Sequence, residues 1–210
     1  MNDSVRDSYD ANAELYTELF LDALDHVPED RERLAAFAGL ARQRTGVVAD
    51  VGCGPGHVVH FLTDLGVPAV GYDIAPEMIA TARHTFPDST FHVGDLAALD
   101  IADASLAGIV SRYSLIHLPP TELPAVFREW SRVLEPGAPV LVALFAAEST
   151  ARHGRPFDHA VVTAYELFAE SVADELRGAG FDDVRIWIRP PRDGERNLDH
   201  ATLIARRADP

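Results

Sequence analysis

Short apolar runs alternate with amphipathic segments along most of the chain. The runs are bounded by glycine, proline or acidic residues and have the length of buried strands. The segments between them carry apolar residues three or four positions apart, as helices that cover a sheet do. The runs that predict strands are 47–51, 69–73, 90–93, 106–111 and 139–144. This alternation predicts an α/β fold built on a parallel sheet.

The carboxyl-terminal part follows a different pattern. A helix near 166–179 is expected to end at Gly180, and strands are expected at 184–188 and 201–205. Because no helix separates these two strands, they should form an antiparallel hairpin. The segment 146–164 has no clear period and leaves the fifth strand at the sheet edge where ligands bind. We expect a long functional loop there.

A glycine-rich turn follows the first strand. Asp50 stands at the carboxyl end of the strand, and Gly52, Gly54 and Gly56 follow it ahead of a helix. Such a turn in an open α/β sheet is where a ligand approaches the backbone closely. A dinucleotide site needs Gly-x-Gly-x-x-Gly, but its last glycine would fall here on a histidine or a valine. The spacing and the acid at position 50 therefore argue against a bound pyrophosphate.

The pattern Val-x-Asp-x-Gly-Cys-Gly-x-Gly resembles the first motif of class I S-adenosylmethionine-dependent methyltransferases. Three further elements are similar to that family in the same order: Asp73 at the end of the second strand, Gly-Asp-Leu at 94–96, and Val-Leu-x-Pro-Gly at 133–137. The resemblance covers residues 47–144. It implies a Rossmann-like, doubly wound sheet of seven strands, mostly parallel with the last strand antiparallel, and helices on both faces.

The resemblance also implies how the chain is divided. Helical spacing predicts helices over 4–22 and 29–44, and the family resemblance makes residues 1–45 an amino-terminal helical cap. Residues 46–210 then form the methyltransferase core of one globular domain. Within it, 146–165 is expected to act as a substrate lid or loop.

By resemblance, S-adenosyl-L-methionine is the cofactor and S-adenosyl-L-homocysteine the product. Asp73 would bind the ribose hydroxyls, or it caps the next helix. Asp95 and the Leu96 amide would bind adenine, or Asp95 belongs to a simple turn. The cysteine in the turn is a nucleophile or merely a small residue. The predicted cofactor-binding residues are Tyr16, Asp50, Gly52, Cys53, Gly54, Gly56, Asp73, Ile74, Met78, Gly94, Asp95, Leu96 and Arg112.

Several residues are candidates for catalysis or for binding the acceptor. His117 follows the fourth strand, where a neutral histidine could remove a proton or only shape the pocket. Arg112 could bind a carboxylate or form a structural ion pair. Aromatic residues of the first helix either touch the ligands or form its apolar stripe. The predicted substrate residues are Tyr9, Tyr113, His153 and Phe157.

Composition narrows the function classes. The formal net charge of −15 argues against a nucleic-acid substrate, which requires a basic face. The sequence shows no signal-peptide pattern, no apolar run long enough for a membrane, and one cysteine, so we expect a cytoplasmic protein. No acidic cluster for a divalent metal is evident, and no metal is expected. Oligomeric state is not readable from the sequence.

The sequence therefore predicts a methyltransferase that methylates an oxygen or nitrogen of a small molecule by in-line displacement. Secondary metabolites fit such a role. Two other classes stay open: a cofactor-binding module without catalytic activity, and an NAD(P)-dependent oxidoreductase. The glycine spacing disfavours the latter.

Overall fold

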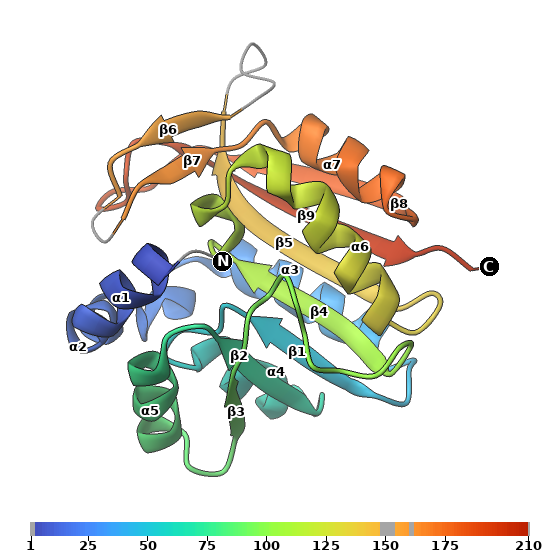
Figure 1. Cartoon of the computed structure of the whole chain (residues 1–210), viewed down its shortest axis with the longest axis horizontal. Helices are drawn as coiled ribbons and strands as arrows, with labels where there is room; N and C mark the ends of the chain where they lie inside the picture. The colour runs from blue at the N-terminus through green and yellow to red at the C-terminus, as the bar shows by residue number, and fades with distance from the viewer. Residues whose placement is uncertain (1–2, 148–153, 160–161, 210) are drawn as a thin grey trace.

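The computed structural model describes residues 3–147, 154–159 and 162–209, and a seven-stranded sheet forms its centre (Figure 1). The strands of this sheet are β1 (Val47–Val51), β2 (Ala69–Asp73), β3 (Thr90–Val93), β4 (Leu106–Arg112), β5 (Pro139–Ala146), β8 (Phe181–Arg189) and β9 (Asp199–Arg207). Their order is β3-β2-β1-β4-β5-β9-β8. Strand β9 runs antiparallel to both of its neighbours, and the other pairings are parallel. This arrangement confirms the predicted sheet with its last strand reversed.

Helices cover both faces of the sheet (Figure 1). On one face, Phe127 and Trp130 are fully buried against apolar strand residues. On the other face, Leu34 and Phe37 are buried in the same way. Burial of such large side chains supplies most of the driving force for this packing. The α-helices are α1 (Asp3–Ala11), α2 (Ala13–Phe20), α3 (Pro28–Ala41), α4 (His57–Asp64), α5 (Pro76–Thr85), α6 (Leu123–Val133) and α7 (Ala169–Gly178). Short 3-10 turns are η1 (Ala23–Asp25), η2 (Leu115–His117) and η3 (Pro120–Glu122).

The strand order reverses at β1, which pairs with β2 on one side and with β4 on the other. Asp50 is in register with Gly71 of β2 and with Val110 of β4. The carboxyl ends of these three strands therefore meet at one place, which is where an open α/β sheet binds its ligand. Helices α1 and α2 both contact α5 and lie beside this edge (Figure 1).

Two details of the predicted elements were wrong. The single helix expected over 4–22 is two helices, because Asn12 leaves the helical conformation and its Nδ2 donates to the Ser8 carbonyl at 2.7 Å. The described residues between 146 and 166 contain a hairpin of β6 (Arg155–Phe157) and β7 (Ala164–Glu166), so α7 begins only at Ala169. Strands of three residues are too short to show an alternating pattern.

Candidate active site

The glycine turn after β1 lies close to its neighbours. Gly52, Gly54 and Gly56 have φ values of 78°, 50° and 89°, in the left-handed region that favours glycine. A Cβ at Gly52 would stand 2.3 Å from the Ser114 Cβ, and one at Gly56 would stand 2.6 Å from Phe91 Cζ. Glycine is thus required here both by the backbone and by close packing.

The carboxylate of Asp73 ties this turn to the end of β2. Its Oδ2 accepts a hydrogen bond from the Gly54 amide at 2.9 Å, and its Oδ1 accepts one from the Ala75 amide at 3.0 Å. Burial raises the pKa of Asp73, and these two amides oppose that rise. The N-cap of α5 is Ala75, so Asp73 does not occupy that position. Each carboxylate oxygen keeps a lone pair with which it can accept a second hydrogen bond.

One cavity, with an empty volume of about 480 Å³ that is partly open to solvent, lies over the turn. It brings together most of the predicted site, and adds Val5 and Ser114. Of the predicted cofactor-binding residues, those that line it are Tyr16, Gly52, Gly54, Asp73, Ile74, Gly94, Leu96 and Arg112. Of the other predicted residues, Tyr9, Tyr113 and His117 line it.

The two added residues carried weak sequence signals. Ser114 hydrogen-bonds Ser111 at 2.5 Å and the Val51 carbonyl at 2.9 Å, and so joins the loop after β4 to β1. Only its place two residues after the fourth strand could have pointed to it. Val5 is the buried residue of α1 and belongs to the apolar stripe of that helix.

The remaining predicted residues do not line the cavity. Cys53 is buried with Val59 and Phe91, and burial raises its pKa well above the ordinary value, which favours a packing role. Met78 is buried beneath α1 and α2, where it packs with Ala13. The others outside the lining are Asp50, Gly56, Asp95, whose Oδ1 accepts from the Ala97 amide at 2.9 Å, and Phe157 in β6. His153 lies outside the described residues.

A tyrosine and a histidine meet at the cavity wall. The Tyr9 hydroxyl and His117 Nε2 are 2.7 Å apart, while His117 Nδ1 lies 3.4 Å from the Thr163 carbonyl. The carbonyl can only accept, so Nδ1 carries the proton and Tyr9 donates to Nε2. Burial lowers the pKa of His117 to about 4, with a further contribution from His159, and raises the pKa of Tyr9 well above 10. Both groups are therefore neutral at neutral pH.

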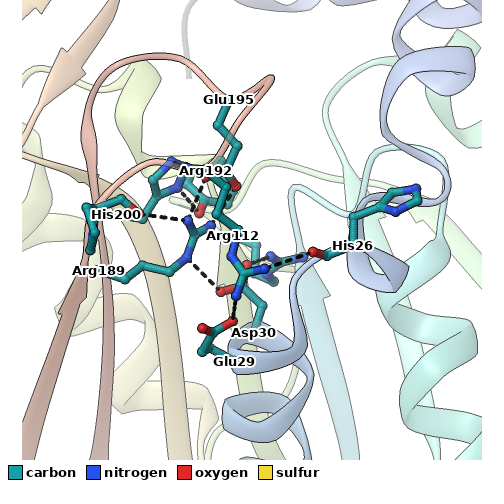
Figure 2. Close-up of polar contacts among 10 residues, drawn as sticks. His26, Glu29, Asp30, Arg112, Arg189, Arg192, Glu195 and His200 are labelled. Carbon is teal, nitrogen blue, oxygen red and sulfur yellow. Dashed lines mark hydrogen bonds and ion pairs between the residues drawn. The ribbon is translucent and has the colours of Figure 1, made fainter.

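Arg112 forms an ion pair behind the cavity. Its Nη2 lies 2.5 Å from Asp30 Oδ2, and Arg189 Nε lies 3.6 Å from the other oxygen of Asp30 (Figure 2). Arg189 in turn holds Glu195 through two hydrogen bonds of 2.6 and 2.8 Å. The structural ion pair left open by the sequence therefore exists, although Arg112 also lines the cavity.

Tyr113 is fixed by the same part of the molecule. Its φ is +55°, in a region that residues other than glycine rarely adopt, and its hydroxyl lies 2.6 Å from His200 Nδ1. His200 Nε2 is 3.5 Å from Glu195 Oε2 (Figure 2). The β8–β9 hairpin thus holds one side chain of the cavity wall.

Known proteins share both the motifs and the fold. A methyltransferase-domain family profile matches residues 48–137, which contain the glycine turn, Asp73 and the Gly94-Asp95-Leu96 element. A demethylmenaquinone methyltransferase of Chlorobaculum parvum is 29% identical over 140 residues, which are 64% of this chain and 56% of that protein. The profile match and this relative support the assignment of the chain as a class I S-adenosylmethionine-dependent methyltransferase. It spans less than two thirds of the length of the first curated relatives that it matches.

Solved structures with the methyltransferase fold are named for different activities. The magnesium protoporphyrin IX methyltransferase of Synechocystis, with bound S-adenosylmethionine, has a TM-score of 0.72 at 19% identity and covers 99% of this chain and 98% of its own. A [4+2]-cyclase has a TM-score of 0.71 at 18% identity and covers 86% of this chain and 82% of its own. At such identities the likeness shows the fold alone.

S-adenosylmethionine is the cofactor of class I methyltransferases, and one buried group of this chain fits a cationic ligand. Asp50 is 1% exposed beneath the turn, and its Oδ2 has no hydrogen-bond partner among the described residues. Burial raises the pKa of Asp50 to about 7, Arg112 opposes this rise, and Asp73 adds to it. An unpaired buried carboxylate is costly unless it is protonated or a positive group approaches.

Two other features bear on the predicted partners. Among the described residues, no group of three or more histidine, cysteine, aspartate or glutamate side chains could hold a metal ion. No helix in the described part of this chain is long and apolar enough to cross a membrane.

Proposed function

We propose that this chain transfers the methyl group of S-adenosylmethionine to an oxygen or nitrogen of a small-molecule acceptor and releases S-adenosylhomocysteine. The observation that carries the proposal is one cavity in which the glycine turn, the Asp73 carboxylate and a neutral histidine meet. In this proposal residues 1–45 are a cap over a core at 46–210, and 146–165 forms part of the acceptor wall.

The cavity offers a place for each part of the cofactor. Asp73 would accept hydrogen bonds from the ribose hydroxyls, since charge-assisted bonds to a carboxylate are the strong class. Gly94 and Leu96 would line the adenine end, with Asp95 beside them. The methionine end would lie over the turn, where a cationic group of the ligand would lie near the buried Asp50 carboxyl.

The cofactor, when bound, supplies a methyl group on a positively charged sulfur. The chain holds the acceptor in line with that methyl and excludes water, and such alignment supplies much of the rate. His117 Nε2 receives the proton of the acceptor, after the Tyr9 hydroxyl turns away or passes the proton on. Transfer would form the bond between the acceptor and the methyl carbon and would leave the electron pair of the broken bond on sulfur.

Several observations support a small-molecule acceptor. A relative is named for demethylmenaquinone, which is itself a small molecule. The formal net charge of −15 is unsuited to nucleic acid. We infer that the protein works in the cytoplasm, because its single cysteine is buried and needs no oxidising compartment.

Calorimetry with three ligands tests the cofactor assignment, and turnover tests the activity. S-adenosylhomocysteine should bind, while NAD and NADP should not. Tight binding of a nicotinamide cofactor without S-adenosylhomocysteine binding would show an oxidoreductase. Transfer of label from S-adenosylmethionine to members of an acceptor library then separates an enzyme from a cofactor-binding module, and binding without any transfer would favour the module.

A further inference from the structure

A continuous series of aromatic rings lies beside the cavity. We call it the aromatic arc; it runs through Tyr9, His117, His159, Phe157, Phe145 and Tyr113. Successive ring centroids are 5.3, 5.2, 6.3, 5.6 and 5.0 Å apart, and the rings meet edge to face or tilted. These are the separations and geometries that aromatic pairs prefer. The rings come from α1, η2, β6, β5 and the loops that follow β4 and β6.

Both ends of the arc reach the cavity. Tyr9 and His117 line it at one end, and Tyr113 lines it at the other. Tyr16 also lines the cavity and lies edge-on to Tyr9 at 5.3 Å. Three of the five tyrosines of the chain thus line this one cavity. Most of the other cavity residues expected to hold the cofactor come from the turn and from the ends of β2 and β3, although Tyr16 and Arg112 were expected to contact it as well.

The hydroxyl groups of the arc are already engaged. Tyr9 is paired with His117 at 2.7 Å, and Tyr113 with His200 at 2.6 Å. The arc therefore presents aromatic rings to the cavity rather than unpaired hydroxyl groups. Burial lowers the pKa values of His117, His159 and His200, so the histidines in and beside the arc are uncharged at neutral pH.

Charged groups of both signs lie near the arc: Arg112 and Arg196 lie over its rings, Asp30 pairs with Arg112, and Glu195 lies beside His200. The Arg112 guanidinium lies 5.6 Å from the Tyr113 ring centroid and is paired with Asp30. The exposed Arg196 lies 5.1 Å from the Phe157 ring centroid. Neutral rings beside a neutral His117 suit an acceptor that enters uncharged and loses its proton to that histidine.

We infer that the acceptor is a planar aromatic ring that carries a hydroxyl group, held against Tyr113 and His117 with the rest of the aromatic arc behind them. This inference rests on the proposed function and specifies its acceptor. The hydroxyl proton passes to His117 Nε2, the oxygen forms the bond to the methyl carbon, and the bond from that carbon to the sulfonium breaks.

Two probes of the same skeleton test this assignment: 2-naphthol, which is planar and aromatic, and decahydro-2-naphthol, which is saturated and puckered. S-adenosylhomocysteine is titrated first, and a failure there overturns the proposed function itself. Each probe is then titrated into the S-adenosylhomocysteine complex by calorimetry. We expect 2-naphthol to bind tighter by roughly threefold to tenfold, as aromatic pairs exceed simple burial by that factor.

Variants show whether the arc causes the preference. Phe145→Leu and Phe157→Leu should each reduce the preference for 2-naphthol while S-adenosylhomocysteine affinity stays unchanged. Phe86→Leu is the matched control, because Phe86 stacks on His60 at the far end of α5. Equal affinity for the two probes, binding of neither to the complex, or a preference that survives both arc variants would overturn the inference.

Discussion

The Tyr9 hydroxyl and His117 Nε2 are 2.7 Å apart although 108 residues separate them in the chain. Tyr9 lies on α1 and His117 in the η2 turn after β4, so this hydrogen bond joins the amino-terminal helices to the sheet. Buried groups that depend on one another in this way are sensitive to the loss of either partner.

We expect His117→Asn to lower turnover of an oxygen acceptor by about a hundredfold or more, because general bases contribute that much. Tyr9→Phe should lower it less, by about tenfold, because the base remains but loses its orienting partner. S-adenosylhomocysteine affinity should stay within about threefold in both variants, measured by calorimetry beside kcat. The controls are His84→Asn on the exposed side of α5 and Tyr165→Phe in β7. Parallel losses of affinity and turnover would instead indicate that His117 shapes the pocket.

The pH dependence of turnover follows from the state of His117. Its pKa is lowered to about 4 by burial, so the base form persists down to that region. An unperturbed histidine would lose its base form below about pH 6.5. Turnover of a phenolic acceptor should therefore remain nearly constant from pH 8 to about pH 5 and fall below that. A decline centred near pH 6.5 in the measured kcat profile would contradict this assignment.

Asp73→Asn should weaken S-adenosylhomocysteine binding by about 1–3 kcal/mol, because a neutral amide cannot replace a carboxylate that accepts from amides and hydroxyls at once. The variant also loses a charged acceptor for the Gly54 and Ala75 amides, so thermal unfolding must be measured beside calorimetry. Asp88→Asn, in an exposed turn, is the matched control. Unchanged affinity in a folded Asp73→Asn protein would remove Asp73 from the ribose site.

The strand ends that carry the predicted site were readable from the sequence. Asp50 and Asp73 each end a short apolar run, and parallel strands bring such ends to one edge of a sheet. The spacing of the glycines then distinguished a site for S-adenosylmethionine from a site for a dinucleotide. Local pattern was sufficient because each of these residues is placed by its own strand.

Contacts between distant segments were not readable in this way. Tyr113 meets His200 only because β9 inserts between β5 and β8, which places the start of β9 beside the end of β5. The pairing of Arg112 with Asp30 depends on how α3 packs on the sheet. The three-residue strands of the β6–β7 hairpin are too short for any period. These features result from tertiary packing, which overrides local propensity.

The titration of Asp50 predicts how the free energy of unfolding changes with pH. Its pKa is about 7 in the folded chain, whereas an unfolded aspartate has a pKa of about 3.9. A group with a raised pKa contributes its full stability below about pH 4, and this contribution is lost as pH rises to about 7. Three pKa units correspond to about 4 kcal/mol, which is an upper limit.

Asp50→Asn removes this titration. The change that it causes in the free energy of unfolding of the ligand-free protein should therefore be more stabilising at pH 8 than at pH 4, by about 1–4 kcal/mol. Urea unfolding of the wild type and the variant at both pH values gives this difference, in which the titrations of other groups cancel. Asp88→Asn, in an exposed turn, is the matched control and should show no such pH dependence. The same Asp50→Asn change at both pH values would mean that Asp50 is ionised in the folded chain. The ionised Asp50 would then need a cation beside it, and its Oδ2, which has no hydrogen-bond partner among the described residues, would have to accept a hydrogen bond from a group that binds there.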